Sequence, residues 1–146
     1  MDFITDIVLN KVILSCVISI IIAQLIKMGV NYSREKRWDL SILLSTGGMP
    51  SGHSAVVAAL SASVYLTEGA TSLFAVVFVI AVITIYDSLT IRKTVGHHTS
   101  ILNTILRALK LHNKYSVREL TGHSFTQVIA GIVLGIAVAL AAFMII

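Results

Sequence analysis

The chain has 146 residues, of which 56% are hydrophobic and only 12% are charged. Soluble domains carry about a quarter charged residues, so this composition excludes a water-soluble monomer. One proline and a lone cysteine, Cys16, likewise exclude collagen-like and disulfide-stapled chains. We therefore expect an all-α integral membrane protein. The net charge of +4 is interpreted as a topology signal, and we expect no nucleic-acid partner.

Three apolar runs, at residues 12–30, 73–91 and 125–146, approach the roughly 20 residues that cross a bilayer. A shorter run at 55–66 lies between two of them and is interpreted as a short span shielded by its neighbours. These runs predict one membrane-embedded domain over residues 1–146, a helical bundle with about four transmembrane helices. The first span lacks a basic leader and is expected to be a retained anchor.

Residues 92–124 form the longest polar connection, and apolar residues recur there at helical spacing. This pattern predicts a short amphipathic helix that contains Ile101, Leu102, Ile105, Leu106 and Leu109.

Nine of the eleven basic residues and all five histidines fall in or beside the two connections 31–53 and 92–124. With four crossings, these connections lie on the same side of the membrane. The positive-inside rule then places that side in the cytoplasm and both termini outside. The sequence predicts one polar site at the cytoplasmic face of a bacterial cytoplasmic membrane.

The first candidate motif is Pro50-Ser51-Gly52-His53, which opens the apolar run at 55–66. Ser51 is a good N-cap, and the N–H groups of a helix start, with the positive dipole end, bind anions. His53 is placed to donate a proton to a departing oxygen. The alternative is a simple capped loop in which the histidine bonds only locally.

The second motif begins with Gly122-His123 and leads into the last span. His123 and Gln127 are four residues apart, so they share one helix face, and a histidine oriented by a neighbour is typical of a nucleophile or base. Further upstream, Lys27 and Arg34 are candidate phosphate ligands. Alternatively, His123 only caps the helix, and the two cations only reach lipid headgroups.

In this order, Lys27…Arg34, Pro50-Ser51-Gly52-His53 and Gly122-His123 resemble the type 2 phosphatidic acid phosphatase and vanadium haloperoxidase superfamily. The closest likeness is to a small, divergent bacterial branch marked by Gly-Gly-Met-Pro-Ser-x-His and a later Tyr-Asp stretch, here starting at Tyr86-Asp87. The resemblance runs from about residue 20 to the C-terminus. It implies a metal-independent phosphatase that needs no cofactor.

Residue by residue, the resemblance implies that His123 attacks phosphorus and that His53 protonates the leaving oxygen. Lys27, Arg34, Ser51 and Gly52 would bind the phosphoryl oxygens. Such fixed cations and N–H groups are also what a phosphoryl transition state requires on physical grounds.

The chain departs from the family pattern at three places. No proline follows Arg34. The arginine of the third motif is out of register by one residue, which leaves its role open among Arg118, Arg92 and Lys93. The carboxylate four residues after the nucleophile is replaced by Gln127, which can hold an imidazole but cannot neutralise an imidazolium.

An acid inside a predicted span, Asp87, is either the structural partner of a basic residue or a support for a catalytic histidine. His97 and His98 lack companion cysteines or carboxylates, so we expect no metal site. Gly131 and Gly135 predict close helix packing within the bundle.

The leading functional prediction is hydrolysis of a lipid-linked or amphiphilic phosphomonoester through a histidine nucleophile, weakened by Gln127. The first alternative is a non-catalytic protein that binds an anionic lipid headgroup in the same pocket. The second is a small structural partner of a larger membrane complex. The sequence does not indicate an oligomeric state.

Overall fold

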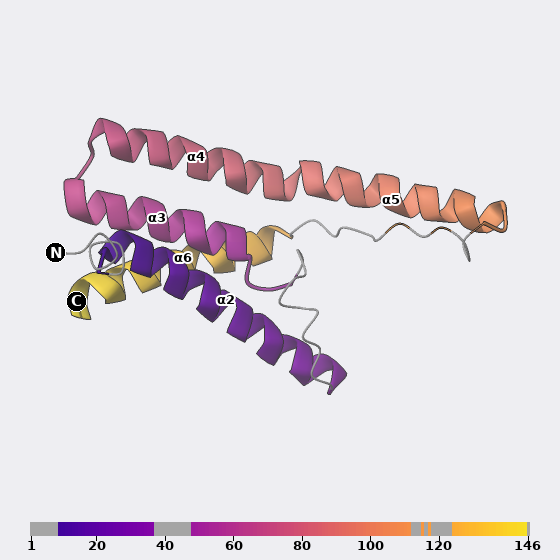
Figure 1. Cartoon of the computed structure of the whole chain (residues 1–146), viewed down its shortest axis with the longest axis horizontal. Coiled ribbons are helices and arrows are strands. Elements are labelled where there is room, and N and C mark those ends of the chain that lie inside the picture. The colour runs from indigo at the N-terminus through magenta and orange to yellow at the C-terminus, as the bar shows by residue number, and fades with distance from the viewer. Residues whose placement is uncertain (1–8, 37–47, 112–114, 116, 118–123, 146) are drawn as a thin grey trace.

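Helices account for all regular structure in the part of the chain that the computed structural model describes, which is residues 9–36, 48–111, 115, 117 and 124–145. They are α2 (Lys11–Glu35), α3 (Gly52–Glu68), α4 (Ser72–Leu89), α5 (Ile91–Ala108) and α6 (Phe125–Ile145) (Figure 1). Helices α2, α3, α4 and α6 pack into a bundle. The predicted all-α membrane bundle is confirmed.

Three helical stretches are long and apolar enough to cross a membrane: Lys11–Ser33, Ser72–Ala108 and Phe125–Ile145. The fourth bundle helix, α3, has 17 residues and contacts α2, α4 and α6. Its length of about 25 Å is slightly less than the roughly 30 Å of bilayer hydrocarbon. It also extends beyond the predicted run 55–66 at both ends, because Ser51 caps it early and Gly69 ends it late.

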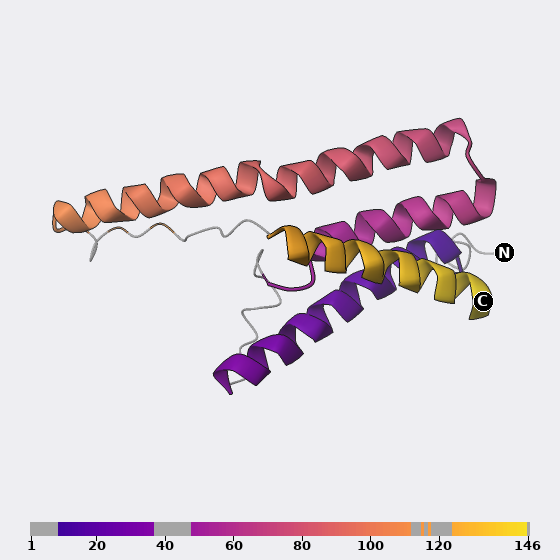
Figure 2. The same cartoon turned by 180° about the vertical axis from the view of Figure 1, so that it is seen from behind.

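The bundle helices alternate in direction, as Figures 1 and 2 show. Lys11 Nζ lies 5.5 Å from the centre of the Phe143 ring, so the start of α2 and the end of α6 meet at one end of the bundle, here called the Lys11 end. Helices α3 and α6 begin at the opposite end, here called the Ser51 end. The start of α2 and the end of α6 therefore lie at the end of the bundle opposite to the starts of α3 and α6.

Small residues form the interior of the bundle. On α2, the buried residues recur at every fourth position from Ser15 to Lys27. On α6, the buried face carries Gly131, Gly135 and Ala139. The buried row of α2 consists of Ser15, Ser19, Ala23 and Lys27. Lipid is as apolar as leucine, so helices in a bilayer associate by close packing of small residues instead of by hydrophobic exclusion. The last member of the α2 row is nevertheless a lysine.

Helices α3 and α6 approach most closely at the two glycines of α6. A Cβ on Gly131 would lie 2.9 Å from Ser54 Cβ and nearer still to the Ser51 carbonyl oxygen. A Cβ on Gly135 would lie 2.8 Å from the Ala59 amide nitrogen and would clash with the Ala55 carbonyl oxygen. The predicted close packing by this glycine pair is confirmed.

Most hydroxyl groups within the described helices are satisfied locally, with the buried Ser63 Oγ as an exception. Ser15, Ser61 and Thr84 each donate to the backbone carbonyl four residues earlier, at 2.7–2.9 Å. Burying a hydroxyl without a partner costs several kcal/mol in hydrocarbon, and this back-bonding removes that cost within each helix. These three hydroxyl groups therefore need no partner on another helix.

Helix α5 leaves the bundle at the Ser51 end as a near-continuation of α4 (Figures 1 and 2). Among the described helices it contacts α4 alone. It is longer than the predicted short helix, and the α4 span ends at Leu89, two residues before the expected end at 91. Thr90 separates the two helices, with φ −105° and ψ −69°.

Gly135→Ala is expected to destabilise the bundle by about 1–3 kcal/mol, because the added methyl group forces α3 and α6 apart. The thermal unfolding midpoint in detergent measures the effect. Gly29→Ala is the matched control, since a Cβ there meets nothing within 4 Å and alanine favours helix. Equal midpoints for the two variants would contradict the close-packing account.

Candidate functional site

The start of α3 is organised by two serines. Ser51 has extended backbone angles, and its Oγ accepts the Ser54 N–H at 3.3 Å and the Ser54 hydroxyl at 3.0 Å. Both residues are fully buried. The predicted N-cap is therefore present, and it fixes where the first turn of α3 begins.

This loop is also joined to α6. The Ser51 N–H donates to the Gln127 carbonyl oxygen at 2.9 Å, a bond between residues 76 positions apart in sequence. Gly131, one turn further along α6, allows the Ser51 carbonyl to lie against the α6 backbone. The starts of α3 and α6, which carry the two predicted histidine motifs, are thus held side by side.

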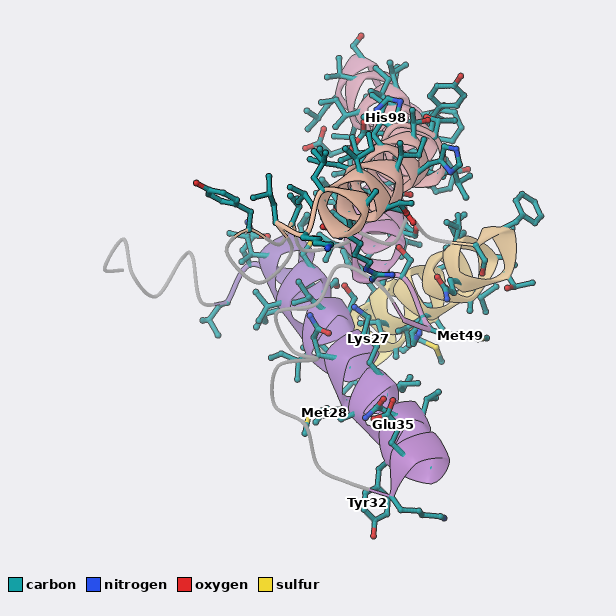
Figure 3. The ribbon with its side chains drawn as sticks, turned by 90° about the vertical axis from the view of Figure 1, so that its right-hand side faces the viewer. Lys27, Met28, Tyr32, Glu35, Met49 and His98 are labelled. Atoms are coloured by element: carbon teal, nitrogen blue, oxygen red, sulfur yellow. The ribbon has the colours of Figure 1, made fainter. Side chains whose placement is uncertain are left out.

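Lys27 supplies a cation at the same end of the bundle. It is only 5% exposed, although it follows a row of small buried residues on a membrane helix. Its aliphatic carbons Cγ and Cδ lie within van der Waals reach of Gly48, where a Cβ would be 3.5 Å from each. In Figure 3 its side chain points from α2 toward the loop that carries Met49.

Gly48 has a φ of +96°, a conformation that side chains rarely adopt. The glycine therefore lets the loop bend over the lysine stem. From Gly48 to Ser51, the loop links the buried cation to the capped start of α3.

His53 lies in the first turn of α3, with its side chain exposed at the Ser51 end. A helix start presents N–H groups and the positive end of the helix dipole. Two such starts and a buried lysine make this end of the bundle electropositive. The arrangement can bind an anion, and a histidine stands beside it.

Gln127 has a structural role that sequence reasoning missed. Its Oε1 accepts the Ser124 N–H at 3.1 Å, while the Gln127 N–H donates to Ser124 Oγ at 3.4 Å. This reciprocal pair is a capping box, and the signal Ser-x-x-Gln was readable in the sequence. The prediction that the Gln127 amide supports His123 is not tested, because His123 lies outside the described part of the chain.

The other predicted site residues divide into two groups. Arg34 lies two turns beyond Lys27 on α2, Arg92 lies in the first turn of α5, and Asp87 is half-buried in the last turn of α4. Described residues of α2 and α4 do not contact each other, so Asp87 and Lys27 lie on helices that do not touch. Two predicted residues, His123 and Arg118, lie outside the described residues.

Within the described ranges, no three side chains of the types that bind metals come together. His97 and His98 are exposed neighbours on α5, away from the bundle.

An apolar groove of about 510 Å³ runs along the bundle between α3, α4 and α6. Ala58 lines the groove about two turns into α3 from the capped loop, and Tyr65 and Phe74 line it near the Lys11 end. Its walls are almost entirely apolar. An acyl or prenyl chain fits such a surface better than a polar ligand does.

Comparisons with known proteins agree with this architecture. Residues 8–138 match the divergent PAP2 family. The chain is 34% identical over 150 residues to the uncharacterized membrane protein YuiD of Bacillus subtilis (strain 168), an alignment that covers 92% of this chain and 95% of that protein. No solved structure matches the chain. The predicted resemblance to a divergent branch of this superfamily is confirmed.

Gln127→Ala is expected to lower the stability of the protein by about 1 kcal/mol, because it removes one half of the α6 capping box. Gln127→Glu keeps an acceptor at the same place, next to the positive helix end, and should unfold at or above the wild-type temperature. Thermal unfolding in detergent separates the two. A glutamate variant as unstable as the alanine variant would contradict the capping role.

Proposed function

Because the chain belongs to the divergent PAP2 family, we propose that it is a membrane phosphatase that hydrolyses a lipid-linked or amphiphilic phosphomonoester. In this proposal, residues 1–146 act as a single membrane-embedded domain. The reaction uses side chains and backbone N–H groups and needs no metal.

One observation carries the proposal: the buried Lys27 lies against the same loop whose Ser51 is hydrogen-bonded to the start of α6. A charged side chain inside a membrane bundle is costly and is by default functional. An anionic phosphoryl group at this place would offset that cost. The groove between α3, α4 and α6 supports an amphiphilic substrate, because it offers an apolar surface next to the polar end.

The proposed chemistry follows from the family pattern and the local geometry. The phosphoryl oxygens bind Lys27, Arg34 and the N–H groups at Ser51 and Gly52. His123 attacks phosphorus to form a phosphohistidine, and His53 gives its proton to the leaving oxygen. Water then hydrolyses the phosphohistidine, with His53 taking a proton from the water. The third-motif cation is assigned to Arg118 or Arg92.

Asp87 is proposed to support the site from α4, either by pairing with a basic residue or by steadying a histidine. Its half-buried position in the last turn of α4, at the Ser51 end, supports this placement.

A second candidate function is non-catalytic binding of an anionic lipid headgroup at the same place. Gln127 favours it, because its amide oxygen caps α6 and carries no charge to stabilise an imidazolium. Stabilisation of the protein by phosphatidic acid vesicles, with no release of phosphate, would identify this function.

The basic residues of the two connections at the Ser51 end support a site that faces the cytoplasm. In a bacterial cell, the substrate would then come from the inner leaflet of the cytoplasmic membrane.

Purified protein in detergent is expected to release phosphate from short-chain phosphatidic acid, and Lys27→Met should lower kcat/KM about a hundredfold. The reason is the loss of one fixed cation from the phosphoryl transition state. Lys11→Met is the matched control, a lysine of the same helix at the opposite end. If both variants kept wild-type activity, the phosphate would not bind at Lys27.

Gln127→Glu tests the cause of weak activity. A carboxylate would stabilise the imidazolium form of His123, and recovery of 2 kcal/mol in the transition state would raise the rate roughly thirtyfold. The gain should disappear when His123→Ala is added. If neither the wild type nor Gln127→Glu shows hydrolysis that depends on His123, binding of a lipid headgroup is the better assignment.

Single cysteines placed by Glu68→Cys and Lys110→Cys, in a Cys16→Ser background, test the orientation. Glu68 lies near the Lys11 end and Lys110 follows α5. In intact cells an impermeant thiol reagent should label the first and spare the second, and permeabilised cells should show both. The reverse pattern would place the site outside the cytoplasm.

A further inference from the structure

Helix α5 carries an apolar face that no part of the described chain covers. Its members follow the helical repeat and are each 40–62% exposed. They are Ile91, Val95, Ile101, Leu102, Ile105 and Leu109. Side chains at these spacings lie on one side of a helix. A face of this size is not stable in water and marks an interaction surface.

Val117 is hydrogen-bonded to a different side of α5. The Asn103 side chain donates to the Val117 carbonyl at 2.8 Å and accepts the Val117 N–H at 3.0 Å. Asn103 lies about 100° around the helix from Leu102, so the bonds to Val117 leave the apolar face open. Lys110, with a φ of +58°, lies just after the last residue of α5 and departs from helical geometry.

The charge of the segment identifies its partner. Between Asp87 and Glu119 the sequence contains six basic residues and no acidic one. They are Arg92, Lys93, Arg107, Lys110, Lys114 and Arg118. Two copies of α5 placed side by side would bring like charges together, so the pattern disfavours self-association. A strongly amphipathic basic helix is typical of binding to an anionic membrane surface.

The position of α5 places it at such a surface. The 18 residues of α4 rise about 27 Å, which nearly spans the hydrocarbon, so α5 begins where the bilayer ends. Thr90 joins the two helices, and its side chain makes no cap for α5; its hydroxyl bonds back to the Tyr86 carbonyl instead. The Thr90 φ of −105° and ψ of −69° depart from regular helix values of about −63° and −42°, so the junction is a place where α5 can turn away from the α4 axis.

We propose that α5 turns at Thr90 and lies on the bilayer surface at the Ser51 end, with its apolar face among the headgroups and its basic residues bound to anionic phospholipids. This inference concerns a surface outside the candidate site and does not depend on catalysis. It would anchor the chain between α4 and α6 at the membrane surface.

Bimane attached at Leu102→Cys or Ser100→Cys, in a Cys16→Ser background, tests the proposal in the full-length protein. The protein is reconstituted in vesicles of 30% phosphatidylglycerol and 70% phosphatidylcholine with nitroxide-labelled lipid. Bimane at Leu102 should be quenched at least twofold more than at Ser100, which lies on the opposite side of α5. Equal, weak quenching at both positions would overturn the proposal, since α5 would then project into water.

Charge dependence is tested with the same label. Quenching at Leu102 should fall in pure phosphatidylcholine, and Arg107→Glu with Lys110→Glu should lower it in the anionic vesicles. Lys36→Glu, at the end of α2, is the control that should leave it unchanged. Equal quenching in neutral vesicles would overturn the assignment to anionic lipid. A Leu102 signal that responds to dilution with unlabelled protein, and not to nitroxide lipid, would assign the face to a second copy.

Discussion

The close approach of α3 and α6 is the constraint on which the rest of the structure depends. Gly131 and Gly135 let the two backbones touch, and the Ser51 N–H then reaches the Gln127 carbonyl at 2.9 Å. Side chains at these positions would separate two helix starts that are 73 residues apart in sequence, Gly52 and Phe125. Because both predicted histidine motifs open these helices, the packing of two glycines in the membrane determines whether a polar site can form at the Ser51 end.

The buried Lys27 adds a cation next to the loop that leads into α3. The interior of α2 is built from Ser15, Ser19 and Ala23, and the two serine hydroxyls donate to backbone carbonyls of their own helix. Lys27 continues the row but cannot satisfy an ammonium group in that way. Desolvating a lone cation is far more costly than desolvating a hydroxyl, so a helix retains one there only where an anion or water meets it. The adjacent loop and helix starts provide the place for such an anion.

Hydropathy alone predicts most of the fold. The lengths of the apolar runs identify the spans, and the number of spans determines which connections lie on the same side of the membrane. The exact start of α3 also follows from the sequence, because Ser51 is a typical N-cap. Ser124-x-x-Gln127 is a readable capping box, but the nearby His123 suggested a different role for this glutamine. Burial of Lys27 is a tertiary property: its spacing of four from Ala23 indicates a shared face, but only the packing of α3 and α6 shows that this face is interior.

The capping box also bears on why a glutamine stands where a carboxylate is expected. At the first turn of α6, a side-chain acceptor is needed for the Ser124 N–H, and either glutamine or glutamate supplies it. The two differ in charge. A carboxylate would stabilise an imidazolium and thereby turnover, but it would also offset the positive potential of Lys27 and the helix starts, which attracts the anion. A neutral amide keeps the cap and leaves that potential intact. If the proposed site binds a phosphate, this neutral glutamine favours holding the anionic group over releasing it quickly.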